Sequence, residues 1–110
     1  MKNNIRFLVI RKNSEISDIL QTGYSLSNEC FTIKYIKTKD KYQFAIATSK
    51  KTFKTAVQRN KIKRQIRTFV QKIVKIAPIK FLIIVKKQYL KNTYAKNNLL
   101  FLNLINKIKE

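Results

Sequence analysis

The sequence has no histidine and only five acidic residues among 110, namely Glu15, Asp18, Glu29, Asp40 and Glu110. Histidine is the most frequent general acid or base in enzymes, and a two-metal nuclease needs clustered carboxylates. Only Glu15 and Asp18 are close together, and both suit the first turns of a helix, where the helix dipole favours acidic residues. We therefore expect no catalytic residue and no metal site in this chain.

Glycine, cysteine and long apolar runs are equally scarce. The single glycine, Gly23, cannot build a glycine-rich phosphate loop. The single cysteine, Cys30, cannot form an internal disulfide and lies in an apolar segment typical of a buried thiol. The apolar run Phe7–Ile10 is too short for a signal peptide, and no run approaches the roughly 18 residues of a membrane-spanning helix. These features predict a cytoplasmic protein with no membrane-spanning segment.

Positive charge dominates what is present. The chain carries 25 Lys and Arg residues and a formal net charge of +20, while 45% of its residues are hydrophobic. This length and composition predict one domain, residues 1–110, with a real core. A charge of that size opposes compaction, and a polyanion would relieve it. Nucleic acid is the first candidate partner. An anionic membrane is the second, but no membrane partner is expected, because a membrane-surface helix carries bulky apolar residues exposed beside its charge.

Hydrophobic periodicity predicts an α+β fold in which helices pack on a small, mostly antiparallel central sheet. Residues 1–12 are expected to be irregular or extended. A helix should begin near Asn13 or Ser14 and end at Gly23, and Pro78 should stop a longer second helix. The expected elements are, in order, the first helix, a possible short strand near Leu26, a hairpin of strands 30–37 and 42–48, the helix 55–76, a central strand 80–86, and a helix 93–109 capped by Thr93 or Asn92.

The helix at 55–76 separates two kinds of side chain. At about 100° per residue, Arg59, Asn60, Lys63, Arg64 and Arg67 span roughly 140° of one side, next to an apolar stripe of Ile62, Ile66, Phe69, Val70 and Ile73. Like charges at i,i+4 repel, and no nearby acid offsets them. Arginine can hold a phosphate with two hydrogen bonds or stack on a base. The pattern predicts a helix with one face for the core and another for RNA.

Two segments together make a recognisable motif. Ser49-Lys50-Lys51 followed by Ala56-Val57-x-Arg59-Asn60-x-x-Lys63-Arg64-x-x-Arg67 resembles the signature of the bacterial ribonuclease P protein component. The resemblance implies the small protein subunit of a ribozyme that removes the 5′ leader from precursor tRNA, with Mg²⁺ bound mainly by the catalytic RNA. It also implies a left-handed strand–helix–strand crossover. The residues that it assigns to the catalytic RNA are Lys50, Lys51, Arg59, Asn60, Lys63, Arg64 and Arg67.

The resemblance further implies a cleft between the first helix and the sheet that holds the single-stranded leader. The matching positions are Ile16, Leu20, Phe31 and Lys34, with Tyr35 beside Lys34. The family usually has aromatic residues on its first helix, so the aliphatic Ile16 and Leu20 predict weaker base stacking. A basic ribosomal or other structural RNA-binding protein is the alternative. DNA binding is not expected, because no turn–helix pair precedes the basic helix.

Overall fold

The computed structural model describes residues 5–108. Residue 109, the predicted last position of the final helix, lies outside the described residues, as do Glu110 and the first four residues of the segment expected to be irregular. The elements are, in order, β1 (Leu8–Val9), α1 (Asn13–Thr22), β2 (Tyr24–Ser27), β3 (Phe31–Lys37), β4 (Gln43–Ala47), α2 (Ala56–Gln71), β5 (Ile79–Val85), the 3-10 helix η1 (Lys87–Lys91) and α3 (Tyr94–Ile105).

The strands form one mixed sheet in the order β1-β4-β5-β3-β2. β5 is central: it runs antiparallel to β3, with Ile33 opposite Ile83, and parallel to β4, with Ile46 opposite Ile83. The predicted hairpin of β3 and β4 is therefore wrong, because β5 lies between these strands. The expectation of a mostly antiparallel sheet is also wrong, because β1 and β4 pair in parallel as well. β5 takes the centre because apolar residues cover both of its faces.

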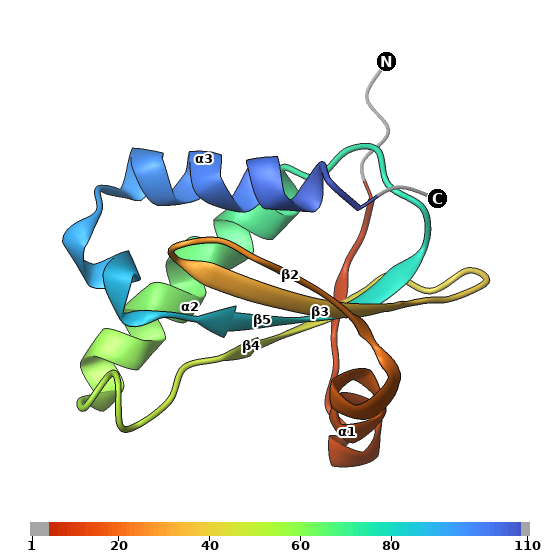
Figure 1. Ribbon diagram of the computed structural model, residues 1–110, viewed down its shortest axis with the longest axis horizontal. Coiled ribbons are helices and arrows are strands. Elements are labelled where there is room, and N and C mark those ends of the chain that lie inside the picture. Colours follow the sequence, from red (N-terminus) through yellow and green to blue (C-terminus); the bar gives the residue numbers. More distant parts are fainter. Residues whose placement is uncertain (1–4, 109–110) are drawn as a thin grey trace.

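The helices lie on both faces of the sheet, with α2 and α3 on one side and α1 on the other (Figure 1). Side chains alternate along β3, so that Phe31, Ile33 and Tyr35 join the larger core under α2 and α3. A smaller cluster of Ile10, Ile19, Ala45 and Leu82 lies on the α1 side. α2 connects the parallel strands β4 and β5, and the left hand of this crossover stays a prediction.

Several boundaries differ from those expected from the sequence. α2 ends at Gln71, well before Pro78, because the Lys72 and Ile73 N–H groups donate to the carbonyls of Phe69 and Val70, i−3 contacts that tighten the last turn. The caps of α2 and α3 are threonines: Thr55 accepts from the Gln58 N–H and Thr93 from the Lys96 N–H. Thr93 is confirmed as a cap, and the strand near Leu26 is confirmed as β2. The N-cap position of α1 is occupied by Lys12, and neither β1 nor η1 was predicted.

Gly23 ends α1 for a reason other than left-handed backbone. Its φ of −74° and ψ of 156° are extended and open to any residue. A Cβ at this position, however, would overlap the carbonyl oxygen of Ile19 and come within 3.0 Å of the carbonyl oxygen of Tyr35. Glycine is needed because the backbone at this position passes between the last turn of α1 and β3 with no room for a Cβ.

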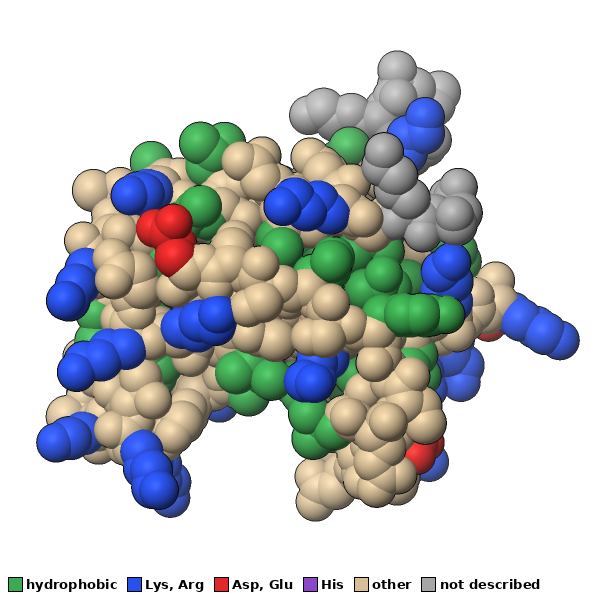
Figure 2. Space-filling model, viewed as in Figure 1, with side chains coloured by type: hydrophobic (Ala, Val, Ile, Leu, Met, Phe, Trp, Pro, Cys, Tyr) green, Lys and Arg blue, Asp and Glu red, His purple; other side chains and the backbone are tan. Residues whose placement is uncertain are grey.

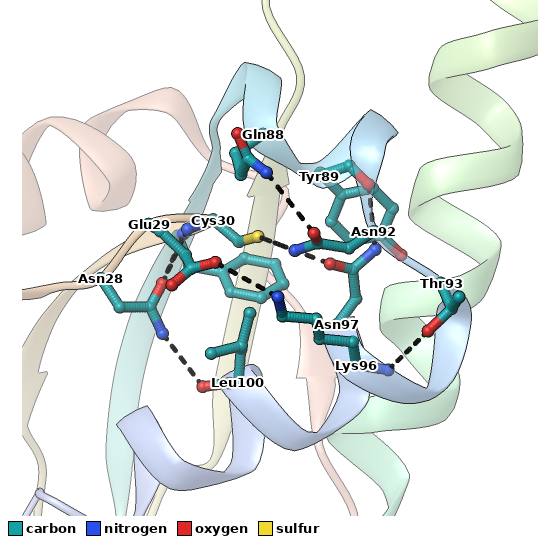
Figure 3. A network of polar contacts seen from close by, with 11 residues as sticks. Asn28, Glu29, Cys30, Gln88, Tyr89, Asn92, Thr93, Lys96, Asn97 and Leu100 are labelled. Carbon is teal, nitrogen blue, oxygen red and sulfur yellow. Dashed lines mark hydrogen bonds and ion pairs between the residues drawn. The ribbon is translucent and has the colours of Figure 1, made fainter.

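A network of polar contacts joins the start of β3 to η1 and α3 (Figure 3). Asn97 is buried, with 1% of its surface exposed, and its side chain accepts from the Cys30 thiol and donates to the carbonyl of Tyr89. Asn92 donates to the Cys30 sulfur over 2.9 Å. Burial, with a smaller contribution from Glu29, raises the pKa of the Cys30 thiol. Cys30 is therefore a buried structural thiol, as its apolar segment predicts.

Candidate nucleic-acid interface

α2 presents the division of faces that its sequence predicts. Ile62, Ile66, Phe69 and Val70 are buried against the sheet and α3. On the outward side Asn60, Arg64 and Arg67 are exposed, while Arg59 and Lys63 are half-buried. On this side, within about two helical turns from Asn60 to Arg67, α2 places one amide and three cations wholly or partly in solvent, and a fourth cation lies close to the preceding loop.

That fourth cation, Arg59, has a partner inside the protein. Its Nη1 donates to the carbonyl oxygen of Phe53 over 2.7 Å. Phe53 is fully buried, and its N–H donates to the Ser49 carbonyl over 2.8 Å, which closes the turn that carries Lys50 and Lys51. Arg59 thus ties the turn to α2 and positions both exposed lysines beside its cationic face. The sequence carried no signal for this contact, because it depends on how the turn folds back.

The cations of α2 have no carboxylate partner within residues 5–108. The two ion pairs there join Lys80 to Glu15 over 3.7 Å and Lys96 to Glu29 over 3.9 Å, and neither involves α2. Figure 2 shows Lys and Arg side chains along the edge where α2 begins, with acidic groups only at isolated places. Unpaired like charges in one region create a positive potential that attracts a polyanion.

A cleft of about 200 Å³ separates this cationic side of α2 from α1. Ile16 of α1, Val9 and Ile10 at the end of β1, and Lys63 and Arg67 of α2 line it, together with Phe44, Ala45 and Ile46 of β4. Figure 2 shows hydrophobic side chains in a hollow beside α1. The cleft therefore has an apolar floor and a cationic wall. Its β1 and β4 residues were missed by the sequence analysis, because β1 is too short to show a pattern.

The five residues predicted for the leader cleft divide between the two faces of the sheet. Ile16 lines the cleft, Leu20 lies one turn further along α1 and is 48% exposed, and Lys34 is half-buried on the α1 side of β3. Phe31 is fully buried on the opposite face, where its ring contacts those of Tyr89 and Phe101. Tyr35 is buried on that same face. The expectation that Phe31 and Tyr35 line this cleft is wrong, since side chains alternate along a strand.

Metal binding and membrane insertion find no support in the described part of the chain. It contains no group of three or more His, Cys, Asp or Glu side chains close enough to hold a metal ion. Over the same residues, no helix has the length and apolar character needed to cross a bilayer.

Comparisons with known proteins agree with one another. The family model described as "Ribonuclease P" matches residues 5–109. A Mycoplasma capricolum protein named "Ribonuclease P protein component" is 37% identical over 105 residues, which are 92% of this chain and 95% of that protein. The structure of the Staphylococcus aureus RNase P protein is 30% identical with a TM-score of 0.77 over 93% of this chain and 97% of its own. The RNase P protein from Thermotoga maritima shares the fold, with a TM-score of 0.82 at 24% identity over 92% and 97% of the two chains.

Proposed function

Since the chain belongs to the family of ribonuclease P protein components, we propose that it binds the catalytic RNA of ribonuclease P through α2 and the adjoining turn. Membership of this family places the chain in a ribonuclease that processes tRNA and has an RNA partner. The observation that carries the proposal is the run of α2 cations, none of which pairs with an acidic side chain in the described part of the chain. The proposed contacts are made by Lys50, Lys51, Arg59, Asn60, Lys63, Arg64 and Arg67.

The cleft between α1 and α2 is the proposed path of the precursor-tRNA 5′ leader. Lys63 and Arg67 supply positive charge for its phosphates, and Lys34 on the α1 side of β3 adds another cation. Ile16 and Leu20 give the bases an aliphatic surface. Stacking on an aromatic side chain is worth about 1–3 kcal/mol per base, and an aliphatic contact gives less. Phosphate contacts therefore carry more of the leader binding in this chain than base stacking does.

The proposed contribution of the protein is to binding, while the catalytic RNA carries out the endonucleolytic cleavage with its Mg²⁺. Mg²⁺ bound mainly by the RNA supplies the metal chemistry of that cleavage. Cationic side chains on α2 neutralise RNA phosphates, so that the RNA needs less Mg²⁺ to fold. Leader contacts favour the precursor over the mature tRNA, which lacks the leader. Both effects assign binding roles to the residues of this chain and leave none of them with a chemical step.

The test is cleavage of precursor tRNA by the catalytic RNA at low Mg²⁺, with and without the protein. Arg64→Ala removes an exposed cation with no partner in the described residues, so we expect the fold to persist and the stimulation to fall. Each lost phosphate contact should reduce the salt slope of binding by about 1. Lys39→Ala, in the loop at the other end of the sheet (Figure 1), is the matched control.

Stimulation by the native protein and by Lys39→Ala, together with its loss in Arg64→Ala, would support the proposal. Equal affinity and an equal salt slope for a folded Arg64→Ala variant would remove α2 from the interface. No stimulation by the folded native protein, with an RNA that is active at high Mg²⁺, would contradict the function itself.

A further inference from the structure

A second cleft lies on the other side of α2, between this helix, η1 and the start of α3. Its volume is about 410 Å³, within the range of about 300–1,000 Å³ found for small-molecule sites. Amides and tyrosines make up most of its polar lining, which consists of Gln58, Lys61, Gln65, Tyr89, Asn92, Tyr94 and Asn97. It has no residue in common with the cleft beside α1 and belongs to none of the sites assigned above.

Hydrogen bonds behind this second cleft fix the direction of two of its amides. The hydroxyl of the buried Tyr89 donates to Oε1 of Gln65 over 2.8 Å. Burial, with the neighbouring Tyr94, raises the pKa of Tyr89, so its phenol stays protonated and keeps this role as donor. The contact identifies the Gln65 oxygen and leaves its NH₂ group, which makes no hydrogen bond within residues 5–108, to donate elsewhere.

Asn92 is oriented in the opposite sense. Its Nδ2 donates to the Cys30 sulfur over 2.9 Å, as part of the network in Figure 3. Its Oδ1 has a single long contact of 3.5 Å with Gln88 and so retains capacity to accept. The cleft therefore presents an amide donor on α2 and an amide acceptor after η1, both held in place before any ligand arrives. A donor and an acceptor at fixed positions are what the edge of an unpaired nucleobase requires.

Charge around the second cleft favours a nucleotide over other ligands. No acidic residue lines it, and the exposed Lys61 is its one cation. On α2, Lys61 lies roughly 60° around the helix from Arg64, so RNA bound over Asn60 and Arg64 reaches the mouth of the cleft. Neutral amides inside and one cation at the mouth match a base inside and a single phosphate outside.

We propose that this cleft binds one unpaired nucleotide of the catalytic RNA, with its base edge held by Gln65 and Asn92 and its phosphate by Lys61. The assignment rests on the proposed function and adds a base-reading site to it. The cationic face of α2 recognises phosphates of any sequence, whereas the second cleft gives the protein a way to select one position of the RNA.

The test uses the full chain and the catalytic RNA with the substitution Gln65→Glu. A glutamate at this position still accepts from the Tyr89 hydroxyl, so the packing is kept, but the two N–H donors become an acceptor oxygen. We expect the dissociation constant for the RNA to rise about tenfold or more. Gln21→Glu, the same change at an exposed position of α1, should leave it within about twofold.

Chemical probing of base edges in the RNA, at saturating protein, provides the second readout. We expect the native protein and Gln21→Glu to protect one unpaired nucleotide, and this nucleotide to become reactive when Gln65→Glu is bound. If Gln65 had a purely structural role, the change in reactivity would not be confined to one base. If Gln65→Glu leaves affinity and protection unchanged while Arg64→Ala weakens binding, the cleft assignment is wrong and the proposed function stands. If the native protein does not bind the RNA, both are wrong.

Discussion

Replacing Arg59 by alanine should affect the protein in two ways that replacing Arg64 does not. Arg59 donates to the Phe53 carbonyl over 2.7 Å, and hydrogen bonds from charged groups contribute about 1.5–3 kcal/mol. Because Arg59 is half-buried, we take the lower end and expect Arg59→Ala to lower the free energy of unfolding by about 1–1.5 kcal/mol. In a domain of this size, each kcal/mol lowers Tm by roughly 4 °C. Arg64→Ala should leave Tm within about 2 °C.

RNA binding should separate the same two variants. Loss of the Arg59 contact frees the turn that carries Lys50 and Lys51, so one substitution removes up to three phosphate contacts. The salt slope of binding should fall by about 2–3 in Arg59→Ala and by about 1 in Arg64→Ala. Thermal unfolding and RNA binding at several salt concentrations measure both effects. Amide exchange at Phe53, whose N–H donates to the Ser49 carbonyl, should become faster in Arg59→Ala only.

An unchanged Tm with equal slopes for the two variants would refute this reasoning and make Arg59 an ordinary phosphate ligand. A lower Tm without the larger change in slope would show that the turn is anchored but its lysines do not contact RNA. Arg59→Lys separates charge from geometry, because lysine keeps the charge but lacks the planar fork that reaches the Phe53 carbonyl. Compared with Arg59→Ala, we expect Arg59→Lys to restore about one unit of the salt slope and little of the lost Tm.

Two further predictions concern the scaffold. Gly23→Ala should lower the free energy of unfolding by about 2 kcal/mol, because the new Cβ overlaps backbone oxygens of Ile19 and Tyr35 and α1 must move away from the sheet. Denaturant unfolding measures this change. The control Ser25→Ala, on the exposed part of β2, should change the free energy of unfolding little. Cys30, whose thiol pKa is raised by burial, should react with a disulfide reagent only as fast as the protein unfolds. Because the folded thiol keeps its proton after the unfolded one has ionised, this group should make the protein less stable as pH rises through about 8.5 and above. Rapid labelling of the native protein would contradict the first statement, and a free energy of unfolding that does not fall over this pH range would contradict the second.

The parts of the fold that depend on local periodicity could be predicted from the sequence, and the pairing of strands could not. The apolar stripe and the cationic face of α2 follow from residues within a few turns of one another, and both are where the pattern put them. The alternation along β3 was also clear locally. The partner of β3 is β5, however, which comes more than 40 residues later in the chain and displaces the nearer β4. Proximity in sequence favoured a hairpin that the more apolar β5 excludes.

The site shows the same distinction. Cations on one helix face were predictable, but the Arg59 contact and the cleft of Gln65 and Asn92 depend on segments that only the tertiary structure brings together. The error over Phe31 has a different origin, because the prediction follows the family resemblance, whereas the alternation of Phe31 with Lys34 along β3 is visible in the sequence itself. Strand alternation is a steric constraint, so it should have placed Phe31 in the core, where it is fully buried.

The clustering of charge on α2 has a cost that the rest of the helix offsets before RNA binds. The pairs Arg59–Lys63 and Lys63–Arg67 at i,i+4 each destabilise the helix by about 0.2–0.5 kcal/mol. Burial of one large apolar side chain contributes about 1.5–3 kcal/mol, and α2 buries Ile62, Ile66, Phe69 and Val70. The helix is therefore formed in the free protein, and binding does not have to supply the entropy of folding it. Its charges, which have no carboxylate partner within residues 5–108, are then available for the proposed RNA contacts, because the folded helix has already brought them together.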